Sequence, residues 1–312
     1  MVGRGFGDEV PRHMLQAVRC VHMRWDYNAN FGVDSPYYRG CSSWQPLAPT
    51  SSENIMGGET QFGPEMSLAD GLLRELGSEP PIFFVKYAMG STKITRDWLP
   101  TPSQEQPIIV GMNLVVEEDQ LEVFPNLEQV SSGKIKRRAN KDEVLIAGGS
   151  SMIVNGHEMI SLAGRGAVRR SGVSIQPSFY ESFIQFCQEG IAAAPQPAKL
   201  AGFFWFQGES DQKGHHAATY SDNLQGFVQK VRVDLSCPRL PFVASQVFDG
   251  AVGMDCSNVN QQIEQACSKL DNAACSRLVG RPRCFKDGHM GGEGLLKVGA
   301  DMASAYVRLS DQ

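Results

Sequence analysis

The sequence has no long apolar run and no excess of positive charge. No apolar stretch approaches the roughly 20 residues that a helix needs to cross a membrane, and no apolar segment of signal-peptide type follows Met1. Lys and Arg number 29 against 34 Asp and Glu, which gives a net charge of −5. These absences argue against a membrane-spanning protein and against a surface that binds nucleic acid or anionic lipid.

The eight cysteines include no Cys-x-x-Cys pair, so the sequence gives little sign of a zinc site or a thioredoxin-type site. Four of them fall between residues 256 and 284. Such a group is compatible with local disulfides in an exported protein and equally with buried free thiols. Both interpretations stay open. The cellular location is open too, because a secreted or endomembrane protein would fit if a signal peptide preceded Met1.

The 312 residues contain an alternation of apolar strands and amphipathic helices. Continuous apolar runs predict strands buried on both faces, at 82–88, 203–206 and 240–247, with a short last strand at 278–279. Apolar residues at helical spacing predict helices, at 64–76, with Pro64 at the first helical position, and at 177–191, 220–231, 258–270 and 293–308. This alternation predicts an α/β fold with a parallel sheet and helices on both of its faces.

Two segments depart from the alternation. Residues 1–60 are rich in Gly, Ser, Pro and Asn and predict loop with few regular elements. Residues 101–172 alternate short β-like runs with Gly, Ser and charged clusters, and predict an insertion of irregular or small β structure. The basic run at 134–138 within it predicts a solvated loop. We therefore expect one domain spanning 1–312, interrupted by this insertion.

Short polar turns follow three of the predicted elements. They are Gly90-Ser91-Thr92, Gln207 to Asp211, and Asp287-Gly288-His289. In open α/β sheets, ligands bind just beyond the carboxyl ends of the strands. We expect all three turns to lie on one side of the sheet and to form the site.

The turn after residue 203 carries a resemblance to a known family. The string Trp205-Phe-Gln207-Gly208-Glu209-Ser210-Asp211 resembles the Trp-x-Gln-Gly-Glu-Ser-Asp signature of the SGNH-hydrolase-class carbohydrate acetylesterases, the sialate O-acetylesterase-like domain family. Other pieces are similar to that family in the same order: Phe62–Glu65, Lys86–Thr92, Trp98, Tyr220 and Asp287–His289. The resemblance covers most of the chain except 101–172. It implies a three-layer α/β/α fold with a flavodoxin-like parallel sheet.

The chemistry that the resemblance implies is acyl transfer on an acetylated carbohydrate, which needs no metal or organic cofactor. A serine attacks the acetyl ester, His289 serves as the base, and Asp287 orients that histidine. The Gly90 N–H and the Gln207 side-chain amide would stabilise the oxyanion. Glu209, with Asp211, would hold the turn in shape, and Ser91 lies beside the oxyanion donors.

The chain departs from the family in two places. The family's acid stands three residues before the histidine, where this chain has Lys286, and Asp287 stands two before. The family's nucleophile lies in Gly-Gln-Ser-Asn-Met, and this chain resembles the family from that methionine onward. In a sheet of order 2-1-3-4-5 the first strand is internal, so its loss would leave the strands at 82–88 and 203–206 without the partner between them. We therefore expect an upstream strand and serine, with Met1 an internal methionine.

Two other functions fit the same residues. A non-catalytic relative could keep the cleft and bind glycans, with the indole rings of Trp44, Trp98 and Trp205 stacking on sugars, although core packing also explains each tryptophan. Alternatively Ser91 could replace the missing nucleophile, but nothing in the sequence places it against His289.

Overall fold

The computed structural model describes side chains in the α/β part of the chain and backbone alone in the strands between 108 and 169. The described residues are 5–27, 39–51, 60–77, 81–89, 92–94, 98, 108–110, 114–116, 135–140, 143–146, 149–154, 157–161, 167–169, 179–195, 197–212, 215–248, 255–278 and 290–310. Among the helices of these ranges, none combines the length and apolar character that a membrane crossing requires.

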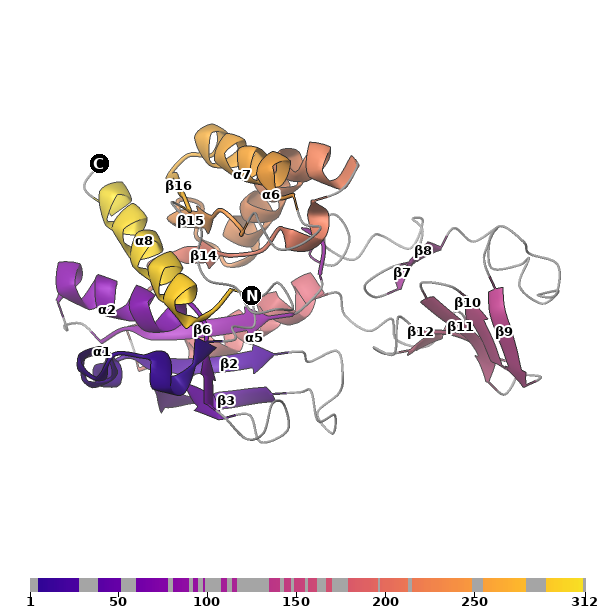
Figure 1. Cartoon of the computed structure of the whole chain (residues 1–312), viewed down its shortest axis with the longest axis horizontal. Helices are drawn as coiled ribbons and strands as arrows, with labels where there is room; N and C mark the ends of the chain where they lie inside the picture. Colours follow the sequence, from indigo (N-terminus) through magenta and orange to yellow (C-terminus); the bar gives the residue numbers. More distant parts are fainter. Residues whose placement is uncertain are drawn as a thin grey trace.

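The second half of the chain forms a parallel sheet of β14 (Phe203–Trp205), β15 (Phe242–Ser245) and β16 (Ala273–Ser276), in that order. The strands are joined by helices, and α6 (His215–Asp234) and α7 (Ser257–Lys269) pack together. Figure 1 shows these two helices on one side of the sheet and α8 (Gly292–Ser310) on the other. The predicted α/β alternation is confirmed here.

The last strand lies earlier than the sequence predicted. It is Ala273–Ser276, and Leu278 lies beyond its end. The strand consists of Ala, Ala, Cys and Ser, which form no conspicuous apolar run. Its position is set instead by pairing with β15, in the register Phe242 to Ala273 through Ser245 to Ser276.

A second three-stranded sheet has the order β3-β2-β6. β2 (His22–Tyr27) runs antiparallel to β3 (Arg39–Pro46) and parallel to β6 (Phe83–Ala88), pairing along the whole of β6. The prediction of loop for residues 1–60 was therefore wrong in this region. β6 itself is half-buried rather than fully buried, except at Ala88. Among the described strands no ladder joins β6 to β14, so the strands expected in one sheet form two groups.

Arg24 explains why the sequence did not reveal β2. This arginine is 2% exposed, although it stands in the middle of a strand. Its guanidinium lies 4.2 Å from the ring centre of Phe186 and donates to Glu189 at 3.3 Å. Both partners belong to α5 (Phe179–Ala193), far along the chain. A charged residue in a local pattern indicates loop, whereas here distant contacts satisfy its charge.

The remaining N-terminal elements are short. α1 (Arg12–Ala17) precedes β2, and a small antiparallel sheet has the order β1-β5-β4. Its strands are β1 (Gly5–Phe6), β4 (Thr50–Ser51) and β5 (Thr60–Phe62). Strand β1 contacts α8, so the start of the described chain lies against the last helix.

The helix predicted at 64–76 is confirmed as α2 (Glu65–Leu76), which begins one residue later because Pro64 is its N-cap. It ends at Gly77, whose φ of +82° is readily adopted only by glycine. α2 packs closely on α8, because a Cβ at Gly299 would collide with the carbonyl of Pro64 and a Cβ at Gly71 would collide with Ala303. The two glycines thus let the helix backbones approach each other.

The segment predicted as an insertion does contain β structure. Its larger sheet is antiparallel, of order β13-β12-β11-β10-β9, and a hairpin of β7 and β8 precedes it. The strands are β7 (Ile108–Val110), β8 (Leu114–Val116), β9 (Ile135–Asn140), β10 (Glu143–Ile146), β11 (Gly149–Val154), β12 (His157–Ser161) and β13 (Ala167–Arg169). Most of the basic run predicted as loop belongs to β9, because backbone pairing with β10 extends it.

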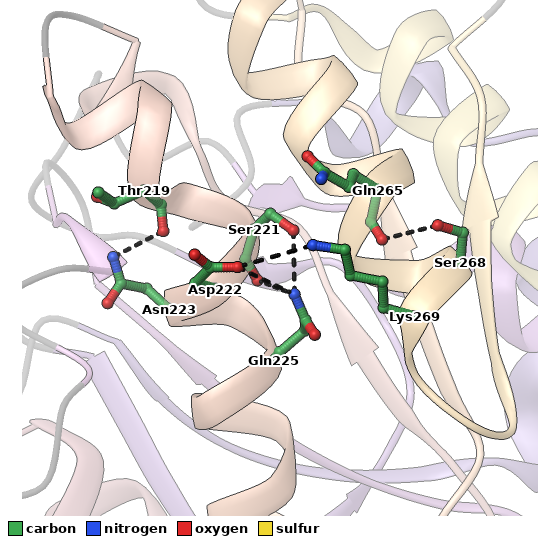
Figure 2. A network of polar contacts seen from close by, with 8 residues as sticks. All are labelled: Thr219, Ser221, Asp222, Asn223, Gln225, Gln265, Ser268 and Lys269. Carbon is green, nitrogen blue, oxygen red and sulfur yellow. Dashed lines mark hydrogen bonds and ion pairs between the residues drawn. The ribbon is translucent and has the colours of Figure 1, made fainter.

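One exposed ion pair joins α6 to α7, and the other polar contacts in Figure 2 lie within one helix or the other. Lys269 lies 3.9 Å from Asp222 across the two helices, and both side chains are exposed. Gln225 donates to Ser221 within α6. Exposed pairs of this kind contribute at most about 1 kcal/mol, so the apolar contact beneath them holds the helices together.

Candidate active site

Two of the three predicted turns meet at the carboxyl ends of β6 and β14. The Gln207 side-chain amide, which follows β14, donates to the carbonyl oxygen of Thr92 at 2.7 Å. Thr92 follows β6 and is 2% exposed, and Gln207 is 8% exposed. The expectation that these turns lie at one edge is confirmed for this pair, although 115 residues separate the two partners.

Asp211 forms hydrogen bonds to both of these segments. Its carboxyl oxygen Oδ2 accepts from the Gln207 amide at 2.8 Å and from the Ile94 backbone N–H at 3.1 Å. Asp211 is completely buried. Because Ile94 belongs to the segment after β6, this one oxygen fixes the position of both loops.

Tyr220 of α6 also forms hydrogen bonds to Gln207. Its hydroxyl donates to the Gln207 backbone carbonyl at 2.7 Å and to the Gln207 side-chain oxygen Oε1 at 3.0 Å. The same hydroxyl accepts from the Trp205 indole N–H at 3.1 Å. Burial, reinforced by the charge of Asp211, raises the pKa of Tyr220 well above its usual value of 10. The phenol therefore stays protonated and acts as a donor.

Both amide hydrogens of Gln207 are engaged in this arrangement. One is directed at Thr92 and the other at Asp211. A side-chain amide carries two donors, so Gln207 has no N–H left for a further acceptor unless one of these bonds is released. The sequence motif predicts that Gln207 lies in the site, but it does not predict that both of its amide hydrogens are already hydrogen-bonded.

Glu209 folds back on its own turn. Its Oε2 accepts from the Gly208 backbone N–H at 3.1 Å, and its carbonyl accepts from Gln212 at 3.0 Å. Gly208 has a φ of +153°, and a Cβ there would stand 2.8 Å from Val259. The carboxylate thus stabilises a tight turn that requires glycine.

Trp98 and Trp205 pack in the hydrophobic core, whereas Trp44 lies outside it. Trp98 is 3% exposed, lies edge-on to Trp205 with 5.1 Å between ring centres, and donates to the Thr92 hydroxyl at 3.0 Å. Trp205 is 6% exposed. Trp44 is half-buried and lies edge-on to Phe83. Burial removes Trp98 and Trp205 as platforms on which a sugar could stack.

Gly90, Ser91, Asp287 and His289 lie outside the described residues. The described chain resumes at Met290, and α8 starts at Gly292. A Cβ at Gly292 would collide with the carboxylate of Glu9, which accepts from the Phe6 N–H at 2.6 Å. A carboxylate at a helix N-terminus is favourable. Glu9 therefore lies against the first residue of α8, and it belongs to no motif from which the sequence would have identified it.

Asp26 is a further titratable group near this edge of β2 and β6. It is the last residue but one of β2 and pairs in register with Tyr87. Its Oδ1 is buried and has no hydrogen-bond partner among the described residues. Burial raises the pKa of Asp26 to about 6, and the nearby Arg24 opposes part of that rise.

We expect the stability of the protein to fall between about pH 4 and pH 6 because of Asp26. In the unfolded chain this carboxyl loses its proton near the ordinary aspartate pKa of 3.8, whereas in the fold it holds the proton up to a pKa of about 6. The unfolded state then binds fewer protons, so raising the pH favours unfolding. Asp26→Asn should remove this fall and stabilise the protein above pH 6 by about 1–2 kcal/mol, after discounting for partial exposure.

Urea unfolding at pH 4, 5, 6 and 7 measures this effect. Asp222→Asn, at a side chain that is 82% exposed, is the matched control. Curves for Asp26→Asn and Asp222→Asn that run parallel across this range would contradict the assignment.

A family model and a curated relative match this chain. A family described as carbohydrate esterase, sialic acid-specific acetylesterase, matches residues 152–308. A probable carbohydrate esterase of Arabidopsis thaliana is 28% identical over 129 residues, which are 41% of this chain. That match spans about half of the relative's length, 47%.

Solved structures share the fold. A protein from Arabidopsis thaliana superposes with a TM-score of 0.55 at 16% identity, over 99% of this chain and 93% of its own. A carbohydrate acetylesterase from Xanthomonas citri gives 0.54 at 13% identity, over 98% of this chain and 53% of its own. NanS gives 0.53 at 12% identity, over 99% and 92%. These likenesses support the expected α/β architecture.

Proposed function

Because the chain belongs to the carbohydrate esterase family described as sialic acid-specific acetylesterase, we propose that it acts as a carbohydrate O-acetylesterase, removing acetyl groups from acetylated sugars. The observation that supports this most directly is the buried network that joins Gln207, Thr92 and Asp211. The network places the family's signature turn beside the turn after β6. That edge of the fold is where α/β proteins bind their ligands.

In the proposed reaction a serine oxygen attacks the acetyl carbon while His289 takes the serine proton. Asp287 orients His289. The tetrahedral oxyanion receives hydrogen bonds from the Gly90 N–H and from Gln207. His289 then gives the proton to the departing sugar oxygen, and water, activated by the same histidine, releases acetate from the serine.

Gln207 has to exchange one partner in this scheme. In the resting arrangement its amide donates to the neutral carbonyl of Thr92. Hydrogen bonds to a charged acceptor are about twice as strong as bonds to a neutral one. An oxyanion therefore competes well with that carbonyl, while the bond to Asp211 keeps the amide in place.

The alternative is a non-catalytic relative that binds glycans. It is favoured by one observation, that both amide hydrogens of Gln207, the proposed oxyanion donor, are already engaged by Thr92 and Asp211. The burial of Trp98 and Trp205 weighs against sugar stacking at those rings, so such a protein would have to bind sugars mainly through polar groups.

The 312-residue chain, and the same chain preceded by the expected upstream strand and its Gly-Gln-Ser-Asn serine, are assayed for release of acetate from an O-acetylated sialic acid and from p-nitrophenyl acetate. We expect His289→Ala to lower hydrolysis about 100-fold or more. His13→Ala, at an exposed position in α1, should change nothing. Ser91→Ala tests whether that serine serves as the nucleophile.

The outcomes separate the two functions. Glycan binding without hydrolysis by the extended chain, with intact circular dichroism, would support the binding protein and overturn the esterase. Hydrolysis that survives His289→Ala would overturn the assignment of His289 as the base.

A further inference from the structure

A hollow of about 230 Å³ lies between β16 and α8, away from the Gln207 network. β16 is the outermost strand of its sheet, and α8 packs beside it (Figure 1). Four lining residues of α8 recur at helical spacing and so share one face of that helix. The polar and charged lining residues are Ser276, Arg277, Lys297, Asp301, Ser304 and Arg308.

The lining has an excess of positive charge. Lys297 pairs with Asp301 at 2.7 Å within α8, and Arg277 pairs with Glu264 at 3.0 Å at the surface. Arg308 makes no ion pair in the part of the chain that the structure describes. The chain as a whole carries a net charge of −5. A basic hollow on an acidic protein attracts small anions selectively to that place.

Ser276 supplies a second and independent observation. It is 3% exposed, and its hydroxyl has no hydrogen-bond partner in the described residues. Its backbone is satisfied, since the Ser276 carbonyl accepts from the Gln246 N–H at 3.0 Å. Buried hydroxyls are usually paired, because an unpaired one costs about 1–3 kcal/mol. The hollow that Ser276 lines is where a partner can be supplied.

We propose that this hollow binds a small oxyanion, a group such as phosphate, sulfate or carboxylate. Arg308 provides the uncommitted charge and a planar fork of donors that matches two oxygens of such a group. Arg277 and Lys297 add positive charge, and the Ser276 hydroxyl can donate to a remaining oxygen, whereas the Ser304 hydroxyl already donates to the Ala300 carbonyl. The site shares no residue with the proposed esterase centre, so it is independent of that function.

Isothermal titration calorimetry with sodium phosphate, at an ionic strength held constant with sodium chloride, tests the proposal. We expect saturable binding of one phosphate per chain with a dissociation constant in the millimolar range. Arg308→Gln, at an exposed position, should weaken binding at least fivefold. Ser276→Ala should also weaken it. Arg239→Gln removes the same charge from an exposed position outside the hollow and should leave the affinity unchanged.

Titrations with two kinds of anion test whether the bound oxyanion belongs to an acidic sugar or is free phosphate. Glucuronate is compared with glucose, which has no carboxylate, and with inorganic phosphate. Tighter binding of glucuronate would assign the hollow to an acidic sugar, and tighter binding of phosphate would assign it to the free ion. No saturable binding of either anion, or equal weakening by Arg308→Gln and Arg239→Gln, would overturn the proposal.

Discussion

Lys86→Met is expected to lower the free energy of unfolding by about 3–5 kcal/mol. The Lys86 ammonium lies 2.6 Å from Glu65 Oε2, and the two side chains are 15% and 9% exposed. Glu65 also accepts from the Gly63 N–H at 2.8 Å, so its carboxylate is committed on both oxygens. Removing the lysine leaves a buried carboxylate without its counter-charge, which is far more costly than losing an exposed pair.

Urea unfolding of matched variants measures this difference. Lys269→Met breaks the exposed pair with Asp222 and should cost less than about 1 kcal/mol. Adding Glu65→Gln to Lys86→Met should recover part of the lost stability, because it removes the uncompensated charge. Equal costs for Lys86→Met and Lys269→Met would show that the buried pair contributes no more than a surface one.

Asp211→Ala is the second large effect, an expected loss of about 3 kcal/mol or more. The substitution removes the acceptor of two buried donors, the Ile94 N–H and the Gln207 amide. Each donor left unsatisfied costs about 1–3 kcal/mol. Asp211→Asn keeps a carbonyl oxygen where Oδ2 stood and should lose much less.

The measurement is urea unfolding followed by tryptophan fluorescence, because Trp98 and Trp205 lie beside the network. Asp222→Ala, at an exposed side chain, controls for the loss of one carboxylate. If Asp211→Asn proves as destabilising as Asp211→Ala, charge rather than hydrogen bonding is what the site requires, and the proposed role of Oδ2 is wrong.

Local sequence signals predicted the helices well. α2 was predicted over its full length, because Pro64 and Gly77 mark its ends and both signals act within a few residues. Strand ends were less accurate. β15 was predicted at 240–247 and spans Phe242–Ser245. An apolar run shows where a strand can form, whereas the ladder with neighbouring strands decides where it stops.

Long-range contacts account for what the sequence could not predict. β2 contains Arg24, whose partner Glu189 lies 165 residues away in sequence. The meeting of Gln207 and Thr92 could be predicted, since both follow parallel strands. The use of both Gln207 hydrogens could not, because it depends on how the Thr92 carbonyl and Asp211 are turned in the folded protein.

The close packing of α2 against α8 connects strand β6 to the start of α8, and both lie near the proposed site. α2 is fastened at its first residue to β6 through Glu65 and Lys86. α8 begins at Gly292, shortly after the predicted His289. Gly299 and Gly71 leave no room for a side chain between the helices, so close packing places α8 against α2, and the Glu65–Lys86 ion pair joins α2 to β6.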